Sequence, residues 1–261
     1  MLLIFSKYQG AGNDFVLRNC FNSKVKLSQQ QIAHICDRKF GVGADGYIEI
    51  HPSSDFNFEM RYYNADGNLG SMCGNGARCA VAFAKREGII VNEIEFIAYD
   101  GKHKARIIDN NRIEISIKDV DHIFEGNNFY FMNTGSPHYI RFVSDLESFD
   151  VSNEGEKIRR SKDYSPDGTN VNFAELKGDQ VYVRTYERGV ENETLSCGTG
   201  VTAVALAVML KMNDVNDSTV KVQTKGGELL VKAHKNSDNS FNSIFLEGPA
   251  SFVFSGQIDL S

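Results

Sequence analysis

The chain contains no tryptophan and only four prolines among its 261 residues, and it has no excess of basic residues. Lys and Arg together number 28 against 34 Asp and Glu, which gives a formal net charge of −6. A nucleic-acid or anionic-membrane surface usually needs a basic patch or stripe, so this balance argues against both kinds of partner. The apolar fraction of 41% is that of an ordinary globular protein and excludes a disordered chain.

Long hydrophobic runs are also missing. The longest apolar stretch, residues 201–210, is interrupted by Thr202 and is much shorter than the roughly 20 residues that a membrane-spanning helix needs. The apolar residues 1–5 have neither the basic flank nor the length of a signal peptide, and they predict a strand. We therefore expect no membrane segment and a reducing compartment, most simply the cytoplasm.

The five cysteines follow neither a disulfide framework nor a zinc pattern. No C-x-x-C sequence occurs, and no histidine cluster has zinc-ligand spacing, so we expect no metal. Free cysteines usually serve as small buried side chains, which is how we interpret Cys20, Cys36 and Cys79. Cys73 and Cys197 differ, because each begins a Cys-Gly-x-Gly sequence directly before a predicted helix.

These two motifs are part of an internal repeat. They are separated by 124 residues, and the same offset relates residues 12–16 to 136–140 and residues 45–47 to 169–171. Strand-like segments dominate both halves, and helices are predicted over residues 28–38, 77–87 and 200–212. Repeated landmarks at one spacing indicate two similar halves, each with a cysteine before its central helix.

A cysteine at a helix N-terminus is suited to chemistry as a thiolate. The unpaired N–H groups and the helix dipole favour the anion there, and the glycines let backbone amides approach a ligand closely. Two such thiols, one per half, suggest a pair that faces one ligand. A two-base proton exchange uses both thiols, because one thiolate removes a proton from carbon and the other thiol delivers one to the opposite face.

The glycine-rich residues 41–46 match G-x-G-x-x-G but do not predict a nucleotide site. A dinucleotide fingerprint needs a strand before it and a helix after it, and neither is predicted here. We interpret the segment as a glycine turn and expect no cofactor.

Taken together, the motifs resemble those of the diaminopimelate epimerase family, in the family's order and over nearly the whole chain. The resemblance is carried by residues 10–15, 64–67, 72–79, 186–189 and 196–200. It implies a cofactor-independent isomerase that interconverts LL- and meso-2,6-diaminopimelate, on the route to lysine and peptidoglycan, and that forms a homodimer. It also implies an α/β (α+β) fold of two pseudo-symmetric domains, each a curled, mostly antiparallel sheet wrapped around a central helix. We expect these domains to be residues 1–118, completed by residues 251–261, and residues 119–250.

The resemblance assigns roles residue by residue. Cys73 and Cys197 match the two acid/base thiols, and His138 and Glu187 match supporting residues, with Glu187 also suited to the substrate ammonium. The residues that match the substrate-binding positions are Asn13, Asn64, Gly74, Asn75, Asn170, Glu187, Arg188, Gly198 and Thr199. Two positions depart from the family, because Ser136 stands where asparagine is common and Gly46 where glutamine sometimes occurs.

Other functions stay open at this point. A racemase of the same broad family would act on proline, hydroxyproline or histidine. A thiol hydrolase or redox protein would use Cys197 with His138. A pure binding module would hold a ligand without turnover.

Overall fold

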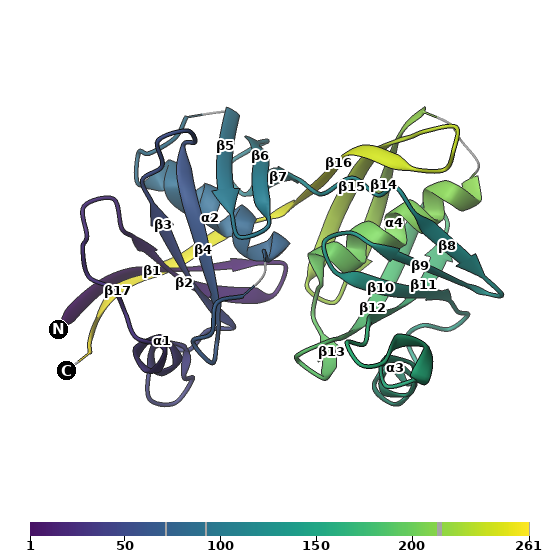
Figure 1. Cartoon of the computed structure of the whole chain (residues 1–261), viewed down its shortest axis with the longest axis horizontal. Coiled ribbons are helices and arrows are strands. Elements are labelled where there is room, and N and C mark those ends of the chain that lie inside the picture. Colours follow the sequence, from purple (N-terminus) through teal and green to yellow (C-terminus); the bar gives the residue numbers. More distant parts are fainter. Residues whose placement is uncertain (71, 92, 213–215, 261) are drawn as a thin grey trace. The chain divides into compact units, whose positions relative to one another are not determined.

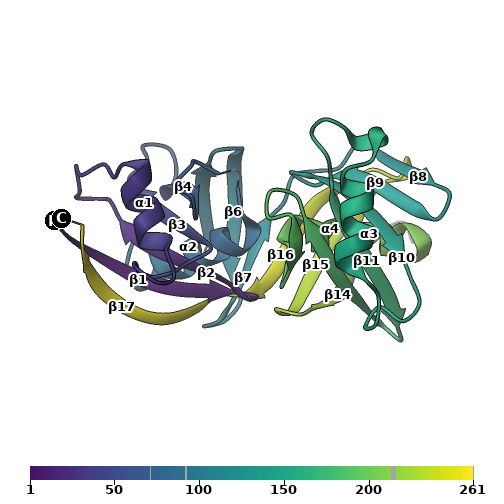
Figure 2. The ribbon, with the colours of Figure 1, turned by 90° about the horizontal axis from the view of Figure 1, so that it is seen from below.

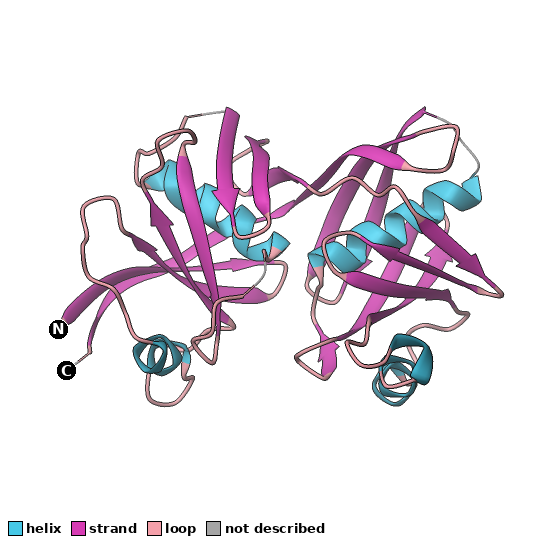
Figure 3. Cartoon of the chain, in the orientation of Figure 1, coloured by secondary structure: helices cyan, strands magenta, loops and turns pink. Residues whose placement is uncertain are grey.

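The computed structural model describes residues 1–70, 72–91, 93–212 and 216–260. It divides into two compact units. Unit 1 consists of Met1–Ile115 with Gly248–Ser261, and unit 2 consists of Ser116–Glu247. Strands dominate both units and helices are few, so the predicted α+β class with two repeated domains is confirmed (Figures 1 and 3).

Unit 1 contains eight strands in its described part, all linked by hydrogen bonding. In chain order these are β1 (Leu2–Gly10), β2 (Asn13–Asn19), β3 (Gly46–His51), β4 (Phe58–Asn64), β5 (Glu93–Ala98), β6 (Gly101–Ile107), β7 (Arg112–Ser116) and β17 (Ser251–Asp259). The strand β17 returns to pair antiparallel with β1, and Figure 2 shows the two side by side. The last strand of the chain therefore belongs to the same unit as the first.

Unit 2 repeats this arrangement. Its strands are β8 (Ile123–Gly126), β9 (Phe129–Asn133), β10 (Pro137–Phe142), β11 (Asn170–Lys177), β12 (Gln180–Glu187), β13 (Asn192–Thr194), β14 (Asn216–Thr224), β15 (Gly227–Lys235) and β16 (Phe241–Pro249). The strands β2 and β3 are parallel in unit 1, and so are β10 and β11 in unit 2. The next pairs, β3–β4 and β11–β12, are antiparallel. The order and direction of these strand pairings are thus the same in the two units.

Each unit is built around one buried helix. The helix α2 (Gly74–Arg86) contacts β1, β2, β3, β4 and β17, and α4 (Gly198–Met212) contacts β9, β10, β11, β12, β14 and β15. Every residue from Val201 to Met209 is buried, as expected of a helix that is apolar on all sides. Both helices begin earlier than the predicted residues 77 and 200. Their glycines lie inside the first turn, where the N–H groups need no intrahelical partner.

Two shorter helices lie on the outside of the sheets. They are α1 (Gln29–Cys36) in unit 1 and α3 (Val151–Arg159) in unit 2, the latter followed by a short 3-10 turn, η1 (Lys162–Tyr164). The helix α1 buries Ile32, Ile35 and Cys36 against Tyr47 and Val16, so Cys36 serves as packing as expected. None of the helices in the described ranges has the length and apolar character needed to cross a membrane.

A capping box fixes the start of α1. The Ser28 hydroxyl accepts a hydrogen bond from the Gln31 amide at 3.3 Å, and the Gln31 side chain accepts one from the Ser28 amide at 3.0 Å. Since this pair satisfies two helix-end donors, we predict that Ser28→Ala lowers the free energy of unfolding by about 1 kcal/mol. Urea denaturation followed by far-UV circular dichroism measures this, as the chain has no tryptophan.

Ser237→Ala is the matched control, because Ser237 lies exposed in a turn and makes no side-chain hydrogen bond in the described part of the chain. Equal unfolding free energies for the two variants would show that the capping box does not hold α1.

Candidate active site

Cys73 and Cys197 occupy the same structural position in their respective units. Cys73 is the N-cap residue of α2 in an extended conformation, and its carbonyl accepts from the Ala77 amide at 2.8 Å. Cys197 directly precedes α4, and its carbonyl accepts from the Val201 amide, also at 2.8 Å. Each thiol therefore sits where the helix N-terminus favours an anion.

The glycines of the two motifs make room for this arrangement. A Cβ on Gly200 would lie 2.4 Å from Oδ1 of Asn172 and 3.4 Å from Cβ of Cys197. A Cβ on Gly76 would lie 3.1 Å from Cδ1 of Ile48 and 3.5 Å from Cβ of Cys73. The second glycine of each motif thus lets the cysteine turn pack tightly against the neighbouring strands.

In unit 1 the structure connects two of the expected substrate-binding asparagines. The Nδ2 of Asn75, in the first turn of α2, donates to Oδ1 of Asn13 at 2.5 Å. The Nδ2 of Asn13 in turn donates to Oδ2 of Asp45 at 3.0 Å. Asn64 is exposed at the end of β4, and its carbonyl accepts from the Gly67 amide in a turn, so it does not join this chain of amides.

The space beside Gly46 is filled by the side chain of Tyr62. A Cβ on Gly46 would lie 2.5 Å from Cε2 and 3.0 Å from the hydroxyl oxygen of Tyr62. On the other side of the ring, a Cβ on Gly70 would lie 2.6 Å from two of its carbon atoms. The tyrosine ring therefore occupies the space that a side chain at position 46 would need.

In unit 2 a hydrogen-bonded series of side chains leads to the thiol. The Thr199 hydroxyl lies 3.5 Å from Sγ of Cys197 and 2.9 Å from Nε2 of His138. The other ring nitrogen of His138, Nδ1, lies 3.1 Å from Nδ2 of Asn172. The amide of Asn172 is held in turn, since its Oδ1 accepts from Thr185 and its Nδ2 donates to the Tyr139 carbonyl.

This series fixes the protonation of His138. Because Nδ2 of Asn172 is a donor, Nδ1 of His138 must accept, and the ring proton lies on Nε2, toward Thr199. Complete burial, together with the positive charge of Arg188, lowers the pKa of His138 to about 3. His138 is thus a neutral donor to Thr199, and the hydroxyl of Thr199 can donate to the Cys197 thiolate.

The remaining expected residues of unit 2 lie around Asn170. Its Nδ2 donates to the Ser136 hydroxyl at 2.7 Å, and its Oδ1 accepts from the Arg188 amide at 2.9 Å. Arg188 is half-buried and donates to the Asp167 carbonyl. Glu187 accepts from the Thr194 hydroxyl at 2.8 Å. Ser136 is therefore a hydrogen-bond partner of Asn170 within the cluster.

Sequence reasoning missed Asn172 and Thr185. Asn172 lies two residues after Asn170 on β11, so both side chains project from the same face of the strand. This spacing was a usable signal for Asn172. Thr185 lies opposite Asn172 on β12, which only the strand pairing reveals.

Comparison with known proteins identifies the family. The diaminopimelate epimerase family model matches residues 5–123 and 130–253. A protein of Flavobacterium psychrophilum with the name diaminopimelate epimerase is 47% identical to this chain, over 95% of this chain and 97% of its own length. One of Chlorobaculum tepidum with the same name is 40% identical, over 96% and 99%. The chain belongs to the diaminopimelate epimerase family. It is an isomerase of the epimerase class.

Solved structures of other proteins share the fold of this diaminopimelate epimerase family member. A PhzF-family phenazine biosynthesis protein of Bacillus anthracis matches over 100% of both chains with a TM-score of 0.80 and 13% identity. A probable proline racemase of Agrobacterium radiobacter matches over 99% of this chain and 93% of its own, with a TM-score of 0.75 and 12% identity. At these identities the likeness concerns the fold alone.

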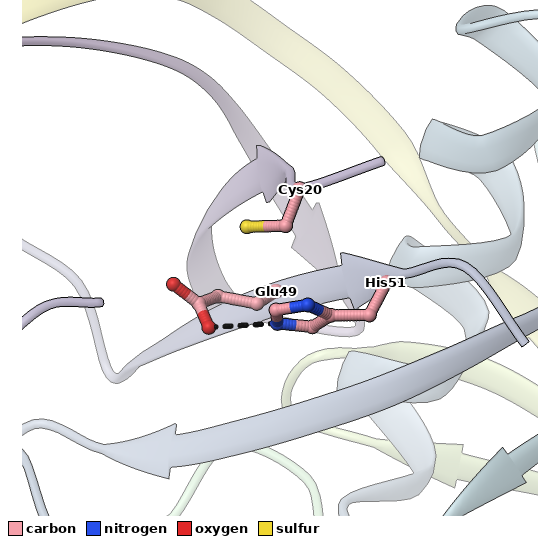
Figure 4. Close-up of side chains that lie close together, drawn as sticks. All are labelled: Cys20, Glu49 and His51. Atoms are coloured by element: carbon pink, nitrogen blue, oxygen red, sulfur yellow. Dashed lines mark hydrogen bonds and ion pairs between the residues drawn. The ribbon is translucent and has the colours of Figure 1, made fainter. Parts of the chain in front are cut away.

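One further cluster could in principle hold a metal ion. The ligand atoms of Cys20, Glu49 and His51 lie within 4.8 Å of one another (Figure 4). The Glu49 carboxylate, however, already interacts with His51 at 2.9 Å, with the Tyr47 hydroxyl at 3.2 Å and with Arg18 at 3.4 Å. Burial, aided by the charge of Glu49, raises the pKa of the Cys20 thiol to about 12, so the thiolate form is disfavoured. We interpret the cluster as a satisfied polar group under the sheet of unit 1.

The buried neutral state of His138 predicts a pH dependence of stability. An unfolded histidine has a pKa near 6.5, so acid protonates the unfolded chain while native His138 stays neutral. The contribution of His138 to the free energy of unfolding is therefore fully present above pH 6.5 and decreases as the pH drops toward 3. Between pH 7.5 and pH 5, wild type should lose about 2 kcal/mol more unfolding free energy than His138→Gln, measured by urea denaturation. Parallel losses in both proteins would contradict a neutral, buried His138.

Proposed function

We propose that Cys73 and Cys197 are the two acid/base groups that convert LL-2,6-diaminopimelate to meso-2,6-diaminopimelate. The observation that carries the proposal is their equivalence, since each thiol stands at the N-terminus of the central helix of its unit. A chemistry that inverts one carbon needs a proton acceptor on one side and a donor on the other. Two equivalent thiols from two repeated units are suited to those two roles.

In the proposed step, one cysteine thiolate takes the Cα proton and becomes a thiol, while the bond electrons pass to Cα and its carboxylate. The other cysteine thiol then gives its proton to the opposite face of Cα and becomes a thiolate. The Cα–H group is a very weak acid, so the negative charge that develops on Cα and the carboxylate must be stabilised. The first-turn N–H groups of α2 and α4, at Gly74–Asn75 and Gly198–Thr199, supply fixed dipoles for that purpose.

Polar side chains of both units would hold the rest of the substrate. We assign substrate contacts to Asn13, Asn64, Asn75, Asn170, Glu187 and Arg188. The guanidinium of Arg188 suits a carboxylate and the carboxylate of Glu187 an ammonium group. His138 supports the reaction through Thr199, as a neutral donor beside Cys197. We further propose that the reaction uses no cofactor, because the two thiols account for both proton transfers and the two helix N-termini for the stabilisation of charge. We also propose that it serves lysine and peptidoglycan precursor synthesis in the cytoplasm.

The cysteine variants test the mechanism. We predict that Cys73→Ala and Cys197→Ala each lower the rate of epimerisation by about 10³-fold or more, because a general acid or base contributes 10²–10⁴-fold. The measurement is the conversion of LL-diaminopimelate in D₂O, with deuterium incorporation at Cα followed by NMR. Cys36→Ala is the matched control, since Cys36 is the buried last residue of α1 and its replacement should leave the rate unchanged.

The same assay separates the alternatives. A hydrolase or a one-base enzyme would keep its activity without Cys73, and a redox protein would cycle between dithiol and disulfide. A binding module would hold the substrate with no exchange of the Cα proton. Any of these results would overturn the two-thiol proposal.

We also propose a homodimer, supported by exposed apolar side chains on the paired strands β1 and β17. Leu2 and Ile4 are 63% and 68% exposed, and Val253 and Phe254 are 52% and 44% exposed. Leu2 and Ile4 alternate along β1 and so share one face of the sheet. Several exposed apolar side chains on one pair of strands are typical of an interface with another protein copy.

Light scattering after size-exclusion chromatography tests the dimer. We expect wild type at the mass of two 29.1 kDa chains and Ile4→Glu at the mass of one, because a buried unpaired carboxylate disfavours association. Ile108→Glu is the control, as Ile108 is exposed in unit 1 but lies outside β1 and β17. Wild type at the mass of a single chain, or a dimeric Ile4→Glu, would exclude this interface.

A further inference from the structure

Arg78 is a buried cation that the proposed reaction does not use. It lies in α2, five residues after Cys73, and its side chain is fully shielded from solvent. Its guanidinium donates to Oδ1 of Asn75 at 2.6 Å and to the carbonyls of Gly74 and Pro249, each at 3.3 Å. Within the described ranges, no carboxylate forms an ion pair with it. Burying a charge without a counter-ion is costly, which suggests that the site benefits from it.

The guanidinium begins a chain of hydrogen bonds with a defined direction. It donates to Asn75, whose Nδ2 donates to Oδ1 of Asn13, whose Nδ2 donates to the Asp45 carboxylate. A guanidinium can only donate and a carboxylate can only accept. With a cation at one end and an anion at the other, each of the two amides has a single orientation that satisfies both neighbours.

Asp45, the last member of this hydrogen-bond series, is itself held in place. Its Oδ1 accepts from Arg38 at 2.7 Å, and its Oδ2 also accepts from the Asp14 amide at 3.2 Å. The two amides are therefore oriented from both ends, by Asp45 at one and by Arg78 at the other. If Arg78 were replaced by an apolar side chain, Asn75 would lose this donor to its oxygen, and the amides would be oriented from the Asp45 end only.

Unit 2 provides an internal comparison. The residue 124 positions after Arg78 is Thr202, which is also fully buried and also donates to the carbonyl four residues earlier, that of Gly198. Thr199 stands where unit 1 has Asn75, so unit 2 has no amide at this position to orient. Unit 1, which has the Asn75–Asn13 amides, therefore has the guanidinium of Arg78 at this position. Unit 2, which lacks those amides, has the hydroxyl of Thr202 instead.

We propose that Arg78 is a positioning residue that locks the side-chain amides of Asn75 and Asn13 in the orientation needed to bind substrate. This inference rests on the proposed function, in which both asparagines contact diaminopimelate. Arg78 acts through the two amides and does not itself touch the substrate. A flipped Asn13 would present its oxygen where it now presents N–H groups, and a substrate acceptor would then be repelled.

Steady-state kinetics of Arg78→Met and Arg78→Lys test the proposal. We expect Arg78→Met to raise KM for LL-diaminopimelate by about 10-fold or more and to change kcat much less, because the amides bind substrate and the thiols carry out the proton transfer. Arg78→Lys keeps a donor and a charge, so it should restore part of the affinity. Thr202→Val is the matched control in unit 2, and its KM should stay within about 2-fold of wild type.

A double variant tests whether Arg78 acts through Asn13. In an Asn13→Ala background, Arg78→Met should raise KM by a clearly smaller factor than it does in wild type, because one of the two amides that it orients has been removed. A purely structural role would instead lower the amount of folded enzyme, and hence the apparent kcat, without changing KM. An unchanged KM in Arg78→Met, or independent and multiplicative effects in the double variant, would overturn the inference. If Arg78→Met does not fold, the same comparison is made with Arg78→Lys.

The two proposals fail in different ways. Wild-type enzyme that shows no thiol-dependent epimerisation would overturn the proposed function. Thiol-dependent epimerisation together with an unchanged KM in the Arg78 variants would overturn only the positioning role.

Discussion

The structure depends on one constraint, which is that each unit buries the N-terminus of its central helix inside a curved sheet. The first N–H groups of a helix have no intrahelical partners, and burial makes unpaired donors costly. The turns at Cys73 and Cys197 place a Gly-x-Gly sequence at these amides, and glycine allows a ligand to approach a backbone amide closely. The same donors that must be satisfied for folding are those that would stabilise a thiolate and a substrate carboxylate.

The duplicated backbone carries different polar groups in the two units. Unit 1 surrounds its helix start with charged and amide groups, from Arg78 to Asp45, whereas unit 2 uses the neutral series from Asn172 to Thr199. In both units each interior member of the series accepts from one neighbour and donates to the next, and in unit 1 Arg78 at one end only donates while Asp45 at the other end only accepts. Such satisfied networks are rigid, which is what a site needs to hold donors in place before the charge develops.

The place of each cysteine before a helix and the start of α1 were predictable from the sequence, because the Cys-Gly-x-Gly motifs and the Ser28 cap are local signals. The helix starts at Gly74 and Gly198 were placed two or three residues too late, since glycine is a poor helix former and only its position in the first turn makes it acceptable. The short strands β8 and β13 were not predicted. The roles of Thr185 and Arg78 could not be predicted, because they depend on strand register and on contacts with residues far away in the sequence.

The protonation state of His138 decides which chemistry Cys197 can carry out, and the sequence alone does not determine that state. From the sequence, His138 beside Cys197 could have formed a thiolate–imidazolium pair, as in a cysteine hydrolase. The structure instead places Thr199 between the ring and the sulfur, and Asn172 holds the ring as a neutral donor. A neutral partner leaves the sulfur free to alternate between thiol and thiolate, which a fixed imidazolium would oppose by stabilising the anion alone. A reversible proton exchange needs that alternation, so the hydrogen-bond direction around His138 favours epimerase chemistry over hydrolysis.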